Sequence, residues 1–305
     1  MLSEQELGGV DVHTRYTGHA HFVETGEARL IARARELLHW LPANHSAWPP
    51  VFESADDPER SVPQLEQLLP PDAQTPSDIR PLIQACADEQ HFFEMQAEFA
   101  PNLVTGFASF GGQSVAVVAN QSLHLSGAVD PAAARKYCRF LNFIASFNYP
   151  LISFLDVPGA MPALAAQQQG MLSTAAQIIH SLYHVRALKI SLVVRRMFGG
   201  TYAMISPKSG EGDLLFAYPQ AMIGVMSDAA MKQVLAQSAK GQQQLAAFAK
   251  TGLRLDDPLL AAASLYLDDI FEPAETRREI IRALQHFARK RVQHFPSKLQ
   301  TNPPL

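Results

Sequence analysis

Uninterrupted apolar runs alternate with helical apolar stripes through the last two thirds of the chain, and this alternation predicts an α/β domain. The runs predicted to form strands are Ser114 to Ala119, Leu151 to Val157 and Ile190 to Val194. The segments between them, Pro131 to Phe147 and Leu164 to Ala187, are predicted helices. Strands that are apolar on both faces are typical of a parallel sheet with helices on both sides.

Two helical stripes flank this region, one on each side. Glu27 to Leu41 carries apolar residues near helical spacing, which predicts one amphipathic helix with a packing role. A second stripe predicts a helix that begins at Pro273, with Glu275 in its first turn. Proline-rich and acidic stretches interrupt the helical pattern elsewhere in residues 1 to about 95, so we expect a connector with local structure there.

Composition narrows the choice of partners and compartment. The 305 residues carry a net charge of −4, without the basic excess that nucleic-acid backbones demand, so we expect no nucleic-acid partner. Only Cys86 and Cys138 are present, which gives no disulfide framework and fits a reducing compartment, so we expect a cytoplasmic protein. No apolar run reaches the roughly 18–20 residues of a membrane span, and the N-terminus lacks a secretory signal, so we expect no membrane partner.

The clearest candidate chemistry is the glycine pair Gly199-Gly200, which follows an apolar run and precedes small residues. Adjacent glycines at this point expose consecutive backbone N–H groups at a helix start, where a developing oxyanion can be held. Val157-Pro158-Gly159 ends the preceding predicted strand in a sharp turn, which is consistent with a site at the carboxyl end of a strand. A purely structural turn remains the alternative for both motifs.

The other polar positions are weaker evidence for a functional site. Asp156 is a possible catalytic carboxylate, although capping of the following turn is the favoured role. His13, His19 and His21 lack an accompanying carboxylate or cysteine framework, so surface or capping roles are favoured and we expect no metal. No G-x-S-x-G elbow is present, so nucleophilic catalysis is not indicated.

A short basic face lies near the start of the helix predicted from Pro131. It contains Arg135, Lys136 and Arg139. Two interpretations stay open for this face: it binds a phosphate group, or its charged side chains are simply exposed to water.

The ordered motifs of the chain resemble the carboxyltransferase β subunit of biotin-dependent acyl-CoA carboxylases, especially the propionyl-CoA carboxylase type. The matching positions run through nearly the whole chain and are specific because they occur in order. They are ELGG at Glu6 to Gly9 with His13, Gly18 and His21; Asp57-Pro58; Phe92-Phe93-Glu94; Gly106-Phe107-Ala108; Ser126-Gly127; Lys136; Arg139-Phe140; Phe147-Asn148; Asp156-Val157-Pro158-Gly159; Gly199-Gly200; Gly212-Asp213; Val225-Met226; Asp268-Asp269-Ile270; Pro273; Thr276-Arg277; and an N-P-P-L end.

The resemblance implies a crotonase-like (ClpP/crotonase) α/β fold, a spiral of ββα units, as one domain preceded by a connector. In this family the β subunit has two crotonase-like halves in tandem, and the chain resembles the C-terminal half. Residues 1–95 would then be the tail of a first half plus a linker. Residues 96–305 would be the C-terminal carboxyltransferase domain.

The resemblance also implies the chemistry and the site. The carboxyl group would move between carboxybiotin, held on a partner carrier protein, and the α-carbon of an acyl-CoA substrate. The backbone N–H groups of Gly200 and Thr201 would form the oxyanion hole that faces biotin. The remaining substrate-binding positions implied by the resemblance are Gly159, Ala160, Met161, Gly199 and Ala203.

The chain departs from the family pattern around these positions. Ala203 replaces an aspartate that usually shapes the acyl pocket, so acyl preference does not carry over. The segment from Ala160 to Gly170 differs from the usual glycine-rich sequence, and a usual R-H-G triplet is Ser173-Thr174-Ala175. We therefore expect a remodelled pocket on the biotin side.

The implied partners are a chain that supplies the N-terminal carboxyltransferase half and a biotin carboxyl carrier with its biotin carboxylase. Crotonase-like halves usually bury a broad apolar face against one another, so we expect a homo- or hetero-oligomer. Two alternatives stay open. One is a non-catalytic structural or assembly subunit, and the other is a decarboxylating carboxyltransferase that acts on a malonyl-type thioester.

Overall fold

A mixed β-sheet forms the centre of the computed structural model, which describes residues 2–205, 208, 212–287 and 290. Its strands follow the order β1-β2-β3-β4-β5-β6-β8, and β7 pairs with β5 beyond the end of β6. The first three strands are antiparallel neighbours, and the pairs from β3 onward are parallel. The strands are β1 (Phe92–Met95), β2 (Leu103–Phe110), β3 (Gln113–Asn120), β4 (Leu151–Val157), β5 (Lys189–Phe198), β6 (Leu214–Ala217), β7 (Met222–Gly224) and β8 (Asp269–Ile270).

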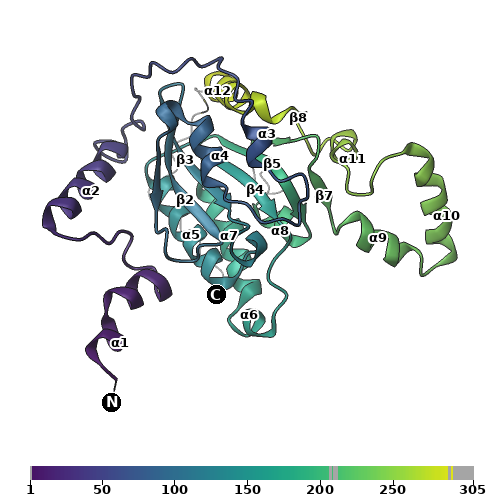
Figure 1. The fold of residues 1–305 in the computed structure, drawn as a ribbon, viewed down its shortest axis with the longest axis horizontal. Helices are drawn as coiled ribbons and strands as arrows, with labels where there is room; N and C mark the ends of the chain where they lie inside the picture. The colour runs from purple at the N-terminus through teal and green to yellow at the C-terminus, as the bar shows by residue number, and fades with distance from the viewer. Residues whose placement is uncertain (1, 206–207, 209–211, 288–289, 291–305) are drawn as a thin grey trace.

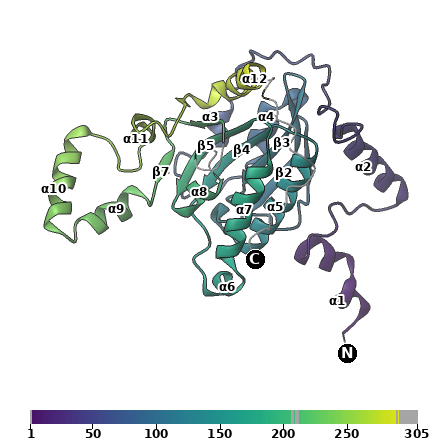
Figure 2. The same ribbon diagram turned by 180° about the vertical axis from the view of Figure 1, so that it is seen from behind.

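Helices cover both faces of this sheet, as predicted for an α/β domain. The helices α5 (Pro131–Ser146) and α7 (Met171–His184) pack on one face, and α3 (Leu65–Leu68), α4 (Arg80–Cys86) and α12 (Thr276–His286) on the other (Figures 1 and 2). Alternate residues of β4 enter the two cores: Leu155 faces α5 and α7, whereas Phe154 faces the opposite layer. The predicted α/β class is confirmed.

The predicted elements differ from the observed ones mainly at their ends. The strand predicted at 151–157 coincides with β4, and the one predicted at 114–119 lies within β3. β5 continues to Phe198, four residues beyond its predicted end. The helix predicted over 164–187 is two helices, α6 (Leu164–Gln168) and α7, because Gly170 adopts a left-handed conformation with φ +81° between them.

The helix predicted to begin at Pro273 starts with a 3₁₀ turn, Pro273–Glu275, and becomes α12 at Thr276. The N-P-P-L end lies outside the described residues. Within the described part of the chain, every helix is too short or too polar to cross a membrane.

Two segments project from the body in opposite directions, one at each end of the long axis of the molecule (Figures 1 and 2). The first carries α1 (Glu4–Gly8) and α2 (Glu27–Trp40), and the second carries α9 (Asp228–Leu235) and α10 (Ala239–Phe248), followed by α11 (Pro258–Ala263). The predicted amphipathic helix is observed as α2, which contacts the core through Leu37 and Trp40 near its C-terminal end and leaves the rest of its apolar stripe exposed. Only Trp40, at the end of α2, is buried, whereas Leu30, Ile31 and Leu38 are 51%, 44% and 66% exposed.

The body of the protein also draws on residues that precede the predicted boundary near residue 95. Leu65 in α3 and Leu82 and Ile83 in α4 are buried in the core layer that contains α12. The boundary itself, between residues 1–95 and 96–305, stays a prediction.

Lys136 holds α5 against the connection between β1 and β2. Its side chain is 1% exposed, and its Nζ donates hydrogen bonds to the carbonyl oxygens of Gln96 (2.9 Å), Phe99 (2.8 Å) and Leu103 (2.6 Å). Lys136 therefore neither binds a phosphate group nor lies exposed to water, the two interpretations considered for the basic face. It links two buried segments of the protein instead. Burial lowers the pKa of the Lys136 amine to about 7.

Lys136→Met is expected to lower the free energy of unfolding by at least about 2 kcal/mol, because the buried carbonyls lose their donor, which serves three of them as an ammonium group and two as a neutral amine. The difference should also grow between pH 7 and pH 10. In that range the unfolded lysine, with its ordinary pKa of 10.5, is protonated and the folded amine is not, so wild-type stability rises with pH. Urea unfolding at several pH values measures both effects.

Lys240→Met, at an exposed position, is the control and should show neither effect. A Lys136→Met deficit that is the same at pH 7 and pH 9.5 would show that the buried amine keeps its proton across this range.

Candidate functional site

The two predicted glycine turns lie at the same edge of the sheet. β4 and β5 are parallel, and Val157 of β4 is paired with Met197 of β5. Gly159 lies two residues after Val157, and Gly199 lies two residues after Met197. The two turns therefore leave the sheet next to each other. This is the carboxyl edge of the parallel strands, where ligands of open α/β sheets commonly bind.

Gly199 turns the chain from β5 into α8 (Gly200–Ile205). Its φ of +66° lies in the left-handed region that favours glycine, and its N–H donates to the Gly224 carbonyl at 3.0 Å. The Tyr202 N–H donates back to the Gly199 carbonyl at 3.1 Å. Gly200 and Thr201 therefore occupy the first two positions of α8, whose N–H groups have no acceptor within a helix.

The space in front of Gly200 is open. Apart from Gly200 itself, its two chain neighbours and the backbone of α8, no heavy atom of the described residues lies within 4 Å of the position that a Cβ on Gly200 would occupy. Thr201, in contrast, is fully buried, and its hydroxyl donates to the Phe198 carbonyl at the end of β5. This contact turns the Thr201 side chain back toward the strand, and Thr201 as a whole is buried, whereas Gly200 is exposed.

The turn after β4 is held by Val129, which lies just before α5. The Val129 N–H donates to the Gly159 carbonyl at 3.2 Å, and the Met161 N–H donates to the Val129 carbonyl at 2.8 Å. Gly159 has a φ of +140°, and Gly159, Ala160 and Met161 are all half-buried. The structure thus brings Gly159–Met161 to the same edge as Gly199–Thr201, while the side chain of Ala203 lies outside the described part of the chain.

Asp156 lies directly below these turns in a buried ionic cluster. Its carboxylate accepts hydrogen bonds from Arg195 Nη2 (2.5 Å) and Nε (3.1 Å) on one oxygen and from Arg196 Nε (2.8 Å) on the other. All three side chains are at most 6% exposed. Asp156 therefore takes neither of the roles considered for it, because both of its oxygens are engaged by arginines inside the protein.

A β-bulge makes this cluster possible. β4 advances by two residues between Leu155 and Val157, whereas β5 advances by four between their partners, Val193 and Met197. Consecutive residues of a regular strand point to opposite faces. The additional residues in β5 relax this alternation, so that neighbouring arginines reach one carboxylate.

The arginines also bond to two connections, the one between α3 and α4 and the one between β3 and α5. Arg195 donates to the Thr75 carbonyl at 2.7 Å and to Ser122 Oγ at 2.8 Å, and Arg196 donates to the Ser126 carbonyl at 3.0 Å. Neither arginine was predicted as a site residue from the sequence. The sequence does contain a signal for them: two charged residues stand between an apolar run and a glycine pair. Such a position indicates that an opposite charge is buried nearby.

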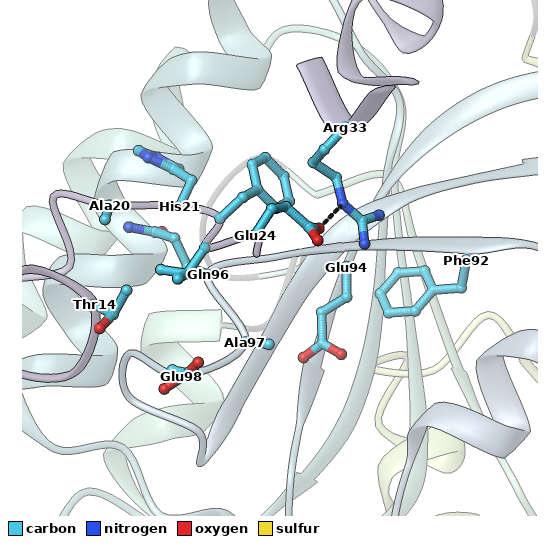
Figure 3. A pocket seen from close by; sticks show the side chains of 12 residues that line it. Thr14, Ala20, His21, Glu24, Arg33, Phe92, Glu94, Gln96, Ala97 and Glu98 are labelled. Carbon is cyan, nitrogen blue, oxygen red and sulfur yellow. Dashed lines mark hydrogen bonds and ion pairs between the residues drawn. The ribbon is translucent and has the colours of Figure 1, made fainter. Parts of the chain in front are cut away.

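A separate cavity of about 330 Å³ lies between the N-terminal segment and β1 (Figure 3). Its charged lining groups have partners on the protein: Arg33 Nε donates to Glu24 at 3.1 Å, and Arg80 donates to Glu94 at 2.7 and 2.9 Å. None of the described residues that line it belongs to the predicted site. The half-buried backbone at the carboxyl edge of β4 and β5 thus remains the candidate site.

Comparison with known proteins identifies the class of the chain. The carboxyl transferase domain family matches residues 1–303, and the chain belongs to this family. The predicted resemblance to the carboxyltransferase β subunit of acyl-CoA carboxylases is confirmed by its relatives.

One such relative is the propionyl-CoA carboxylase beta chain of Roseobacter denitrificans, which is 33% identical over 306 residues, covering all of this chain and 60% of the relative. Methylmalonyl-CoA decarboxylase subunit alpha of Veillonella parvula is 33% identical over 297 residues, covering 97% of this chain and 58% of that protein. The chain thus spans about three-fifths of the length of the relatives that it matches.

The fold is likewise that of a known carboxyltransferase. The crystal structure of transcarboxylase 12S with hydrolysed methylmalonyl-coenzyme A superposes on all of this chain and on 58% of its own chain, with a TM-score of 0.90 at 32% identity. The predicted crotonase-like α/β fold is therefore confirmed. The roles of the individual site residues stay predictions.

Asp156→Asn is expected to destabilise the fold by about 3–5 kcal/mol, because it leaves two buried guanidinium groups around an uncharged amide. Urea unfolding measures the loss.

The matched control is Glu59→Gln, which neutralises the partner of Arg282 in a pair where both side chains are more than half exposed. An exposed pair contributes about 0–1 kcal/mol. Equal losses for the two variants would contradict the assignment of a central structural role to Asp156.

Proposed function

We propose that this chain is the carboxyltransferase component of a biotin-dependent acyl-CoA carboxylase, and that it moves a carboxyl group between carboxybiotin and the α-carbon of an acyl-CoA. The observation that carries the proposal is the start of α8. There, the N–H groups of Gly200, which is exposed, and of Thr201, which is buried, have no intrahelical acceptors, at an edge that Gly159–Met161 also line.

Biotin, attached to a carrier protein, supplies the carboxyl group when it is bound. The open space beside Gly200 fits the close approach of such a group, because a side chain at this position would occupy that space. The N–H groups of Gly200 and Thr201 donate to an oxygen on which negative charge develops as the carboxyl group is transferred. One donor of this kind contributes about 3–4 kcal/mol to stabilisation of a transition state.

Other residues position these donors. Gly199 directs the chain into α8, and the Thr201 hydroxyl fixes the first turn of α8 to the end of β5. Gly159, Ala160 and Met161 form the second wall, held at Val129. Ala203 follows in the same helix, where the family usually has an aspartate, and we propose that this position helps to determine which acyl group is accepted.

We further propose that the acyl-CoA side of the site comes from a chain that supplies the N-terminal carboxyltransferase half. Its support is the exposed apolar stripe of α2, where Leu30, Ile31 and Leu38 remain open to another surface. A biotin carboxyl carrier and a biotin carboxylase would complete a hetero-oligomeric complex. Cys86 and Cys138 are both free thiols, which supports a cytoplasmic location.

The Veillonella relative, named as a decarboxylase subunit, makes the reverse direction worth testing, since the same N–H donors serve transfer in either direction. The assay combines this chain, the partner half, a biotinylated carrier and either propionyl-CoA or a malonyl-type thioester. Transfer in one direction supports the proposal. Failure in both directions, with all components folded, would indicate an assembly subunit instead.

Gly200→Pro tests the donor directly. Proline is compatible with the first position of a helix but has no N–H, so kcat should fall about 10²–10³-fold with little loss of stability. Gly200→Ala is the matched variant, because it adds a Cβ and keeps the N–H. Steady-state transfer rates of the reconstituted complex measure both.

Alanine should cost distinctly less activity than proline. An equal loss in the two variants would mean that the space beside Gly200 is required and its N–H is not.

A further inference from the structure

Three consecutive carbonyls in the connection between β3 and α5 each accept a hydrogen bond from a different buried side chain. The pairs are Arg196 with the Ser126 carbonyl (3.0 Å), Asn120 Nδ2 with the Gly127 carbonyl (3.1 Å) and Asn102 Nδ2 with the Ala128 carbonyl (2.8 Å). The three donor residues are at most 5% exposed. Loops usually run over the surface, where water can satisfy their carbonyls, so three buried donors in a row indicate that the conformation of this connection is closely specified.

The backbone at these carbonyls is strained. Leu125 and Ser126 have φ of +49° and +52°, in the left-handed region that residues other than glycine rarely adopt. Gly127 follows with φ +78°, and a Cβ there would lie 2.5 Å from the Asp156 carbonyl oxygen, so the turn packs directly on the end of β4. Such strain persists only where the surrounding structure imposes it, and it is concentrated at functional sites.

Val129 connects this turn to one wall of the candidate site. Its N–H donates to the Gly159 carbonyl at 3.2 Å, and its carbonyl accepts from the Met161 N–H at 2.8 Å. These two bonds form a parallel β-bridge between Val129 and Ala160. The position of the wall Gly159–Met161 therefore depends on the position of Val129.

Asn102 holds the chain on both sides of Val129. An amide nitrogen carries two hydrogens, and Asn102 Nδ2 donates to the Ala128 carbonyl and also to Asp130 Oδ1, at 3.1 Å. The same Asp130 oxygen accepts from the Ala133 N–H at 2.9 Å, so it also caps the start of α5. One buried amide thus fixes the residues before and after Val129 relative to α5.

We propose that Asn102 and Asn120 are positioning residues for the wall Gly159–Met161, acting through Val129. The inference rests on the proposed function for the ligand of this wall, which is biotin on its carrier. Neither asparagine belongs to the wall. Their buried donors hold the strained turn and Val129 in place, and Val129 sets where the backbone of the wall meets biotin.

Amide hydrogen exchange, followed by NMR, tests the positioning role without any assay of activity. Asn102→Ala removes both donors beside Val129, and Asn120→Ala removes the donor to Gly127. In each variant the N–H groups of Val129 and Met161 should exchange at least about tenfold faster, because fewer side-chain bonds oppose local opening. Asn120→Ala leaves the bonds of Asn102 in place and serves as the second test if Asn102→Ala does not fold.

Kinetics of the reconstituted complex give a readout that a general loss of stability would not produce. In the asparagine variants kcat/KM for the biotinylated carrier should fall about tenfold, whereas KM for acyl-CoA should stay within about twofold of the wild-type value, because only the wall that meets biotin is displaced. A smaller fraction of folded protein would instead lower kcat and leave both KM values unchanged, and that pattern would contradict the proposal.

Thr105→Val is the matched control. Thr105 is fully buried, and its hydroxyl donates to the Met95 carbonyl at 3.1 Å in the antiparallel part of the sheet. This variant should change neither the exchange of Val129 and Met161 nor the carrier kinetics. Unchanged exchange in both asparagine variants, or faster exchange with unchanged kcat/KM for the carrier, would overturn the proposal. An inactive wild-type complex would contradict the carboxyltransferase function instead, and the exchange rates decide the positioning role in either case.

Discussion

The buried contact between Asp156 and the arginines Arg195 and Arg196 fixes the geometry on which the site depends. Removing three charges from water is unfavourable, and their attraction offsets that cost only when the hydrogen bonds are well formed. Here both carboxylate oxygens are engaged, and the remaining arginine donors reach Thr75, Ser122 and Ser126. The cluster therefore joins two strands and two connecting segments at one point.

The position of this cluster explains why the glycine turns are aligned. The bulge that lets both arginines reach Asp156 ends at the Val157–Met197 pair, and each turn begins within two residues of that pair. Val129 then holds the first turn, and Thr201 and Gly224 hold the second. The direction of the backbone N–H groups at this edge thus depends on the Thr201 hydroxyl and on the buried ionic cluster.

Much of the fold follows from the hydrophobic pattern. β4 and α5 were predictable because their apolar residues are nearly continuous or evenly spaced. The end of β5 was not predictable, because Arg195 and Arg196 are charged residues that are expected to be exposed. Their burial depends on Asp156, whose position beside them is known only from the structure. The same limit applies to Lys136, whose three carbonyl partners come from a connection distant in sequence.

The α2 stripe was identified, but sequence pattern alone does not say which surface covers it. The glycine pair indicated a site at a strand end, and only the family resemblance gave its two N–H groups a proposed reaction.

The most direct measurement of the central proposal is a nitrogen–proton NMR titration of the deuterated chain with biotin coupled to a short peptide. If the start of α8 receives biotin, the amide signals of Gly200 and Thr201 should show the largest saturable shifts. Thr251 and Gly252, the same residue types on the α9–α10 segment, should remain in place. Shifts of equal size at both pairs, or no shift at Gly200 and Thr201, would contradict the assignment of these N–H groups to the biotin site.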